Sequence, residues 1–210
     1  MINNELKKKN YFRYIQLLNI KNNLSNEELS LLFILENEIF KIFYSTEEHL
    51  LRKIKYQWFI EEIKKKESNF SLAKNIKQIF NPSVKEKIIL IIECFRDIEN
   101  EFDKYESIIL FFKKINIIYR DIIKIIGNKE LKLCFFFQLM YFCYVRNSNS
   151  KNYFFIEFSS IYDSLNIKEI DNHEKIFIDI FFSKIKKKKK ILRISKLEFL
   201  FKLIYNMILK

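Results

Sequence analysis

The sequence predicts an all-α protein built as a single helical bundle, and three observations lead to this prediction. The 210 residues contain one glycine, Gly127, and one proline, Pro82. Glycine-rich phosphate loops and tight β-hairpins need glycine at positive φ, so this chain lacks the residues that both require. Hydrophobic residues make up 49% of the chain, which is enough for a substantial core. Capping boxes followed by apolar stripes at helical spacing then predict individual helices.

Two helices are expected between residues 25 and 63, joined at Ser45 and Thr46. Each is opened by a capping box, the first at residues 25–28 and the second at residues 45–48. The stripe of the first helix consists of Leu32, Leu35, Ile39 and Ile42. The second helix carries Tyr56, Phe59, Ile60 and Ile63 on one face, with Leu51, Ile54 and Trp58 on an adjoining face. Because its apolar arc is so wide, the second helix is predicted to be central in the bundle.

The remaining helices follow from caps and breakers. Asn81 and Pro82 start a helix through residue 98, because proline fits the first helical position. Residues 105–126 form a long helix that ends at Gly127, a residue suited to a left-handed C-cap. Three later helices are expected: one at residues 131–145, one that begins at a cap formed by residues 171–174, and one at residues 191–209. A loop is expected at residues 147–150, and a partly helical link at residues 152–165. No domain boundary is evident, so residues 1–210 are predicted to form one domain.

Charge and composition restrict the location more than the function. The formal net charge is +12, which favours contact with anionic membrane or nucleic acid. Mutational bias towards lysine codons in an AT-rich genome, such as that of a reduced endosymbiont, also explains this charge. The N-terminus has no apolar signal core, and the longest apolar run, residues 131–145, is shorter than the roughly 20 residues of a membrane span. We therefore expect a cytoplasmic protein, peripheral on the inner membrane if it binds lipid at all. The three isolated cysteines are expected to be buried reduced thiols.

Residues 54–61, Ile-Lys-Tyr-Gln-Trp-Phe-Ile-Glu, resemble the Ile-Arg-Leu-Gln-Trp-Trp-Arg-Glu signature of the squalene/phytoene synthase family. Lys55 stands for the arginine, and Gln57, Trp58 and Glu61 match. Weaker likenesses are spread over most of the chain, at residues 7–14 with Arg13, 32–42, 90–97 with Glu93, 138–146 with Gln138, and 152–163. The closest branch is that of the α-proteobacterial and mitochondrial synthase-like proteins, whose mitochondrial members act in assembly of respiratory complex I.

The resemblance implies a shortened form of the isoprenoid synthase fold, and the departures from it concern catalysis. Active members join two prenyl diphosphates, using Mg²⁺ held by two Asp-rich motifs. At the first motif this chain has Phe40, Lys41 and Tyr44, while Glu36 and Glu38 point roughly 200° apart on a helix. Residues 138–146 contain no aspartate. We therefore expect a pseudoenzyme with no catalytic residues, no cofactor and no metal site. It would assist assembly of a respiratory membrane complex, with a complex subunit or an anionic membrane surface as partner.

Two other functions stay open. A divergent prenyltransferase would need Mg²⁺ and a prenyl diphosphate, and a lipid or prenyl ligand is conceivable even without activity. A basic nucleic-acid-binding module has only the charge in its favour, and no nucleic-acid partner is expected.

Single side chains are given structural roles in preference to chemical ones. Glu93 and Asp97 are read as a solvated or Arg96-paired face, and both His49 and His173 as surface or capping residues. Trp58 is read as a packing anchor rather than a ligand-stacking residue. The lysine run 186–190 is read as solvated, with a peripheral anchor on anionic lipid, formed together with the last helix, as the alternative.

Overall fold

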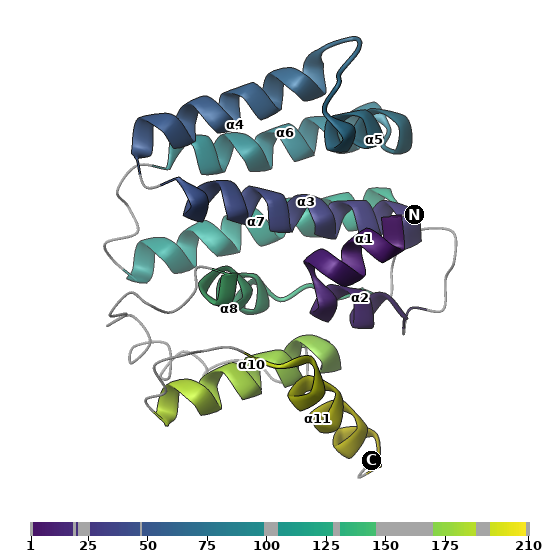
Figure 1. Cartoon of the computed structure of the whole chain (residues 1–210), viewed down its shortest axis with the longest axis vertical. Coiled ribbons are helices and arrows are strands. Elements are labelled where there is room, and N and C mark those ends of the chain that lie inside the picture. The colour runs from purple at the N-terminus through teal and green to yellow at the C-terminus, as the bar shows by residue number, and fades with distance from the viewer. Residues whose placement is uncertain are drawn as a thin grey trace. The chain divides into compact units, whose positions relative to one another are not determined.

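The computed structural model describes residues 2–18, 20, 26–46, 48–98, 105–127, 131–145, 170–187 and 194–208. All regular secondary structure within these ranges is helical, which confirms the predicted all-α class. The chain divides into two compact units (Figure 1). Unit 1 comprises residues 1–103 and 117–131, and unit 2 comprises residues 104–116 and 132–210. That residues 1–210 form a single domain remains a prediction.

Unit 1 is organised around one buried helix. Its helices are α1 (Ile2–Lys9), α2 (Tyr11–Leu18), α3 (Asn26–Ser45), α4 (His49–Lys64), α5 (Ser71–Ile79), α6 (Pro82–Asp97) and the second part of α7 (Tyr105–Ile125). Helix α3 contacts α1, α2, α4, α5 and α6, and Leu29 and residues 31–35 are almost fully buried. Tyr56 from α4 donates a hydrogen bond to the carbonyl oxygen of Ile39 at 2.9 Å, and Phe95 from α6 packs against both Tyr56 and Phe40. These contacts join α3, α4 and α6 into one core.

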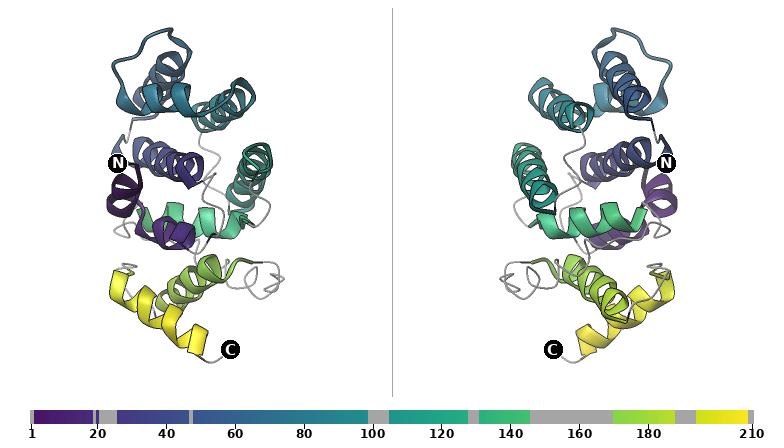
Figure 2. Two further views of the ribbon diagram at one scale, coloured as in Figure 1. Left: turned by 90° about the vertical axis from the view of Figure 1, so that its right-hand side faces the viewer. Right: turned by 90° about the vertical axis from the view of Figure 1, so that its left-hand side faces the viewer.

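The prediction that the second helix, expected to open at the capping box of residues 45–48 and to reach residue 63, is central in the bundle is wrong. Tyr56, Phe59, Ile60 and Ile63 are buried as expected, but the adjoining face, with Leu51, Ile54 and Trp58, is exposed. Helix α4 lies side by side with α6 on the outside of unit 1 (Figures 1 and 2). The wide apolar arc of α4 therefore consists of two surfaces, one buried in the core and one facing outward.

Helix ends agree with the sequence where a cap is strong. The Oδ1 atom of Asn81 accepts a hydrogen bond from the Val84 N–H at 3.0 Å, with Pro82 at the first helical position, as predicted. Helix α7 ends at Ile125, and Gly127 has a φ of +79°, the left-handed conformation expected of a glycine C-cap. The prediction that a capping box at residues 45–48 opens the second helix is wrong. Ser45 ends α3, and the N-cap of α4 is Glu48, which makes no side-chain capping bond. Ser25 of the first box lies outside the described residues.

Unit 2 contains the first part of α7, α8 (Phe135–Val145), α10 (Asn172–Lys186) and α11 (Lys196–Ile208). Aromatic pairs build its core, with ring centroids 5.1 Å apart for Phe112–Phe142, 5.7 Å for Phe136–Phe182 and 5.0 Å for Phe137–Phe177. Helix α8 begins four residues later than predicted, at a point where the buried carboxylate of Glu174 accepts a hydrogen bond from the Cys134 N–H at 2.7 Å. A carboxylate at a helix N-terminus is favoured by the exposed N–H groups there. The predicted loop at 147–150 and link at 152–165 lie outside the described residues.

Asp171 caps α10, and its replacement by alanine is expected to cost about 1 kcal/mol of the free energy of unfolding at pH 7. Its Oδ1 atom accepts a hydrogen bond from the backbone N–H of His173 at 2.9 Å. The same oxygen lies 3.1 Å from the Nδ1 atom of the His173 ring. Burial opposes ionisation, yet these bonds hold the pKa of Asp171 below its ordinary value of 3.8.

Because that pKa is lowered on folding, the stabilisation is present above pH 3.8 and is lost as the pH falls through the lowered pKa. Chemical unfolding of Asp171→Ala and the wild type at pH 7 and at pH 2.5 checks this. The control, Asp171→Asn, keeps a cap without a titratable group. An Ala variant as stable as the wild type at pH 7 contradicts the capping role.

Candidate functional site

Arg13 and Glu36 form a buried ion pair between α2 and α3. Both side chains are fully buried, with the Nε atom of Arg13 3.1 Å from Oε2 of Glu36 and its Nη2 atom 3.1 Å from Oε1. Arg13 also donates to Oε1 of Gln16 at 2.8 Å and lies over the ring of Phe33. Tyr119 is buried beside this pair, and burial together with the Glu36 charge raises the pKa of its hydroxyl. The family-signature residue Arg13 thus has a structural role in unit 1.

Glu36 and Glu38, the carboxylates closest to residues 40–44, where the resemblance predicts the first metal motif, are both paired with cations. Glu36 is bound by Arg13, and Oε1 of Glu38 lies 2.9 Å from the Nζ atom of Lys9 and 3.5 Å from that of Lys41. Phe40, which stands at an expected aspartate position, is buried against Phe95. These side chains form packing and ion-pair contacts among four helices, α1, α2, α3 and α6.

Four family-signature residues lie on α4, and three of them are exposed. The Nζ atom of Lys55 donates to Oγ1 of Thr46 at 2.6 Å, across the junction of α3 and α4. Gln57, Trp58 and Glu61 all face outward, and the Nε2 atom of Gln57 donates to Oε1 of Glu61 at 3.0 Å. Trp58 has 46% of its surface exposed and packs its ring at 5.0 Å from that of Phe70. Trp58, predicted to be a packing anchor, therefore packs on Phe70 but lies on the side of α4 away from its buried arc.

The residues of α6 form the Arg96-paired face predicted for them, and both histidines are half-buried and make polar contacts. Arg96 binds both carboxylate oxygens of Asp97, at 2.7 and 3.0 Å, and donates to Oε1 of Gln57 at 2.7 Å. Glu93 is half-buried and contributes to the electrostatic environment of Arg96. His49 contacts the carbonyl oxygen of Ile98 at 3.1 Å, and His173 contacts the capping residue of α10.

The structure brings only some of the signature residues together. Gln57 bonds to Glu61 and also to the α6 residue Arg96, whereas Arg13 lies in the separate buried pair. Gln138 is fully buried in α8, which belongs to unit 2. Arg146 and the segment at 152–163 lie outside the described residues.

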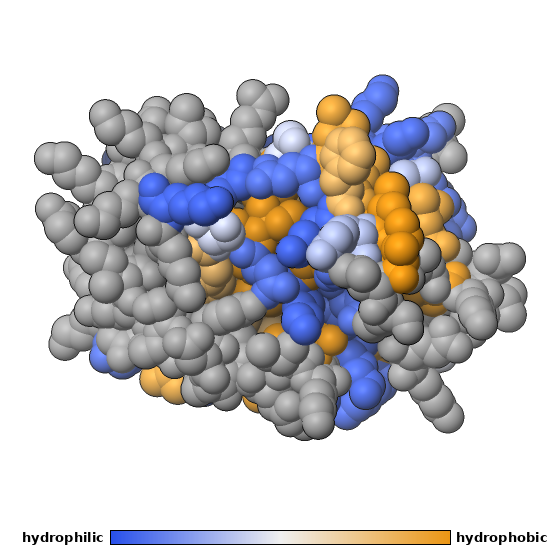
Figure 3. All heavy atoms as spheres, turned by 90° about the horizontal axis from the view of Figure 1, so that it is seen from below, coloured by the Kyte–Doolittle hydropathy of each residue, from blue (hydrophilic) through white to orange (hydrophobic). Residues whose placement is uncertain are grey.

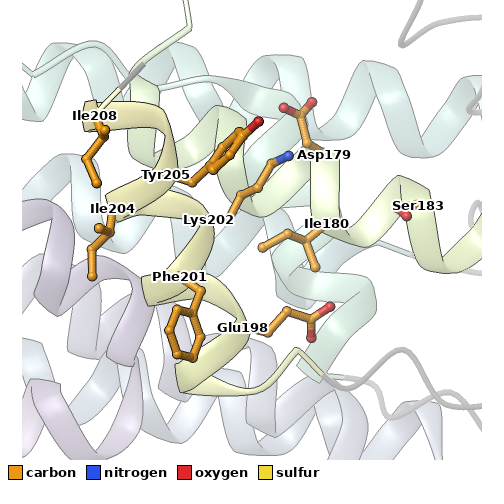
Figure 4. A pocket seen from close by; sticks show the side chains of 9 residues that line it. All are labelled: Asp179, Ile180, Ser183, Glu198, Phe201, Lys202, Ile204, Tyr205 and Ile208. Atoms are coloured by element: carbon orange, nitrogen blue, oxygen red, sulfur yellow. The ribbon is translucent and has the colours of Figure 1, made fainter. Parts of the chain in front are cut away.

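A groove of about 720 Å³ opens between α10 and α11 (Figure 4). It is lined by Asp179, Ile180 and Ser183 from α10 and by Glu198, Phe201, Lys202, Ile204, Tyr205 and Ile208 from α11. The Nζ atom of Lys184, which is itself mostly buried, donates to Oε2 of Glu198 at 2.6 Å and ties the two helices together. Burial raises the pKa of Asp179, and the charge of Lys202 opposes that shift. Most of the lining side chains are apolar, and Asp179, Glu198 and Lys202 are the charged ones.

Helix α11 presents an exposed apolar face. The residues on this face are Leu197, Phe201, Ile204, Tyr205 and Ile208, and each has half or more of its surface exposed. Their spacing of four, three, one and three residues places them on one side of a helix. Figure 3 shows hydrophobic residues open to the surface here, next to hydrophilic ones. Lys187, Lys196 and Lys202 are exposed nearby, and residues 188–190 of the lysine run lie outside the described residues.

The sequence contained part of this site. The spacing of the apolar residues of α11 is visible in the sequence. Residues 199 and 203 are also apolar and lie on the opposite side of the helix, so spacing alone does not show which side is buried. The packing shows it, because Phe199 is buried and Phe201 is exposed. Asp179 and Glu198 were missed, because they come from different helices and no spacing rule connects them.

Neither metal-binding groups nor membrane-spanning helices are found in the described part of the chain. Among those residues, no three His, Cys, Asp or Glu side chains are grouped in a way that could hold a metal ion. No described helix is both long and apolar enough to cross a bilayer. Comparison of the chain with models of protein families, with curated proteins and with solved structures finds no match.

Replacing Asp179 with asparagine is expected to raise the free energy of unfolding at pH 7 by up to roughly 0.5 kcal/mol. The pKa of Asp179 is raised by burial, so its ionised form disfavours the folded state above that pKa. As the pH falls through the raised pKa towards 3.8, the folded state takes up the proton first, and the advantage of the variant disappears. Unfolding curves at pH 7 and pH 3.5 measure the difference. A variant less stable than the wild type at pH 7 contradicts the desolvation argument.

Proposed function

We propose that this chain is a non-catalytic squalene/phytoene synthase-like protein that binds an anionic membrane surface through α11 and assists assembly of a respiratory membrane complex there. The membrane part rests on the geometry of unit 2. The family and the assembly role rest on the resemblance carried by residues 54–61 and the weaker likenesses along the chain.

The exposed apolar face of α11 is the observation that carries the proposal. Five large apolar side chains on a helix of 13 residues are open to solvent, which is costly unless something covers them. A helix of this kind, with lysines beside the apolar face, lies in the plane of a membrane interface. Each lysine near an anionic surface adds about 1 kcal/mol of attraction. Lys187, Lys196 and Lys202 are exposed, and the sequence supplies three more lysines at 188–190.

The ion pairs of unit 1 support the non-catalytic part. A diphosphate-bound Mg²⁺ needs several carboxylate oxygens directed at one point. Glu36 has its two oxygens bound by the Arg13 guanidinium, and Glu38 lies between Lys9 and Lys41. Releasing Glu36 for a metal would leave a buried arginine without its counter-charge, which costs several kcal/mol.

Vesicle co-sedimentation tests membrane binding. The purified chain is mixed with vesicles of neutral phosphatidylcholine alone, or containing 30% phosphatidylserine or cardiolipin, at low and at high salt. We expect binding to the anionic vesicles, which weakens as salt screens the lysines, and little binding to neutral ones. Failure to sediment with anionic vesicles at low salt rules out the membrane part.

Incubation with prenyl diphosphates tests the non-catalytic part. The chain is expected to release no inorganic diphosphate from farnesyl or geranylgeranyl diphosphate in the presence of Mg²⁺, and calorimetry is expected to show no Mg²⁺-dependent binding. Formation of a condensation product would establish the prenyltransferase alternative instead.

A further inference from the structure

The groove between α10 and α11 holds a pair of opposite charges beside apolar side chains. Asp179 of α10 and Lys202 of α11 both line it, and the charge of Lys202 acts on the pKa of Asp179. The Nζ atom of Lys202 also lies over the ring of Tyr205, 5.7 Å from its centroid. Figure 4 shows these three side chains together and Glu198 apart from them. Isoleucine and phenylalanine side chains make up most of the remaining lining.

The groove has the size and the composition of a ligand site. Its volume of about 720 Å³ lies within the roughly 300–1,000 Å³ of such sites, which are mostly apolar and use a few polar groups to orient the ligand. The charge of Glu198 is balanced by Lys184, whose Nζ atom lies 2.6 Å from Oε2 of Glu198. Asp179 and Lys202 are therefore the charges that select a ligand.

The carboxylate of Asp179 is kept at a cost to folding. Burial raises its pKa, so the ionised form disfavours the folded state, and an asparagine of the same shape would avoid this. Ionisable groups that are partly buried next to a specific charge partner are concentrated at functional sites. The place of Asp179 in the groove, beside Lys202, agrees with such a role.

The two charges restrict the headgroup of a ligand. A purely anionic headgroup, such as a fatty-acid carboxylate, is attracted by Lys202 but repelled by Asp179, and a purely cationic one meets the reverse. A zwitterion satisfies both. A primary ammonium can donate hydrogen bonds to the Asp179 carboxylate, whereas the quaternary ammonium of choline has no N–H. Choline is bound instead by aromatic faces, and Lys202 already lies over the ring of Tyr205.

We infer that the groove binds one molecule of phosphatidylethanolamine, with its ammonium at Asp179, its phosphate at Lys202 and an acyl chain along the apolar lining. The inference deepens the proposed membrane function and rests on it for the source of the lipid, because the α11 wall of the groove is the face that would enter the membrane. The ion pair of Lys184 with Glu198 ties that wall to α10.

Calorimetric titration of the full chain with short-chain lipids tests the headgroup. Dihexanoyl phosphatidylethanolamine and dihexanoyl phosphatidylcholine are each used below the critical micelle concentration, so no bilayer is present. The ethanolamine lipid is expected to bind about tenfold more tightly, because its ammonium makes hydrogen bonds to a charged acceptor that choline cannot make. Equal affinities for the two lipids overturn the inference.

Matched aspartate variants locate the ammonium. Asp179→Asn is expected to bring the two affinities within twofold of each other. Asp121 is likewise half-buried and lies next to a lysine, Lys87, but it is on α7 and does not line the groove. Asp121→Asn is therefore expected to keep the preference for the ethanolamine lipid. Circular dichroism confirms that both variants are folded. A preference that persists in Asp179→Asn overturns the assignment of the ammonium.

Matched lysine variants locate the phosphate, which the two lipids share. Lys202→Gln is expected to weaken the binding of both lipids severalfold and by the same factor. Lys196 is exposed on the same helix but does not line the groove, so Lys196→Gln is expected to change either affinity less than twofold. Equal effects of the two variants overturn a phosphate site at Lys202.

Vesicle binding separates this inference from the proposed function. Phosphatidylethanolamine replaces part of the phosphatidylcholine in vesicles with a fixed fraction of phosphatidylserine, and binding is expected to increase severalfold for the wild type but not for Asp179→Asn. Binding that needs anionic lipid but ignores phosphatidylethanolamine overturns the inference and keeps the membrane part of the proposed function. Absence of vesicle binding together with selective binding of the short-chain lipid removes the membrane part and keeps the lipid site.

Discussion

Replacing Arg13 with methionine is expected to lower the free energy of unfolding by about 3–5 kcal/mol. The substitution keeps an apolar side chain of similar length but leaves the Glu36 carboxylate, which is fully buried, without its counter-charge and without its two hydrogen bonds from the guanidinium. It also removes the contact of the guanidinium with the ring of Phe33. Urea unfolding followed by circular dichroism, with the wild type at the same pH, gives the difference.

The double variant Arg13→Met/Glu36→Met is the control for this experiment. It removes both charges together, and buried ion pairs replaced by apolar side chains are often close to neutral in stability. The double variant is therefore expected to be more stable than Arg13→Met alone. A loss below 1 kcal/mol for Arg13→Met would contradict a buried, fully engaged pair and would reopen the possibility that Glu36 can turn towards a ligand.

Replacing Leu197 with glutamate is expected to reduce binding to anionic vesicles roughly thirtyfold. Leu197 is 67% exposed on the apolar face of α11, and transferring such a side chain out of water contributes about 2 kcal/mol. The added carboxylate is also repelled by an anionic surface. Co-sedimentation over a range of lipid concentrations gives the partition coefficient of the variant and of the wild type.

Leu110→Glu is the matched control. Leu110 is 65% exposed on α7, in the part of that helix that belongs to unit 2, but it does not lie on α11. The same chemical change there is expected to alter the partition coefficient less than threefold. Equal losses for Leu197→Glu and Leu110→Glu would show that binding depends on general charge and not on the face of α11.

The fold class was predictable because it depends on local signals. One glycine and one proline exclude most turn-rich architectures, and Asn81–Pro82 and Gly127 mark helix ends by their own backbone preferences. Helix positions in the core were harder to predict. Helix α4 has a wide apolar arc like a central helix, yet α3 is the one surrounded by other helices, because which apolar face is covered depends on contacts between segments distant in sequence.

The candidate site was predictable only in outline. At the positions where the resemblance predicts aspartates, the sequence has other residues, but the pairing of Arg13 with Glu36 spans 23 residues and no local pattern indicates it. The apolar stripe of α11 was visible in its spacing, whereas the groove that it forms with α10 depends on the packing of the two helices and on the Lys184–Glu198 pair.

Tryptophan placed on α11 gives the most direct test of membrane docking. Trp58→Phe removes the natural tryptophan, and Phe201→Trp in that background places a single reporter on the exposed face, where Phe201 has 70% of its surface exposed. With vesicles containing anionic lipid, its emission is expected to shift to shorter wavelength and to be quenched by bromine-labelled acyl chains. An emission spectrum that neither shifts nor is quenched on addition of these vesicles would contradict the docking of α11 on a membrane.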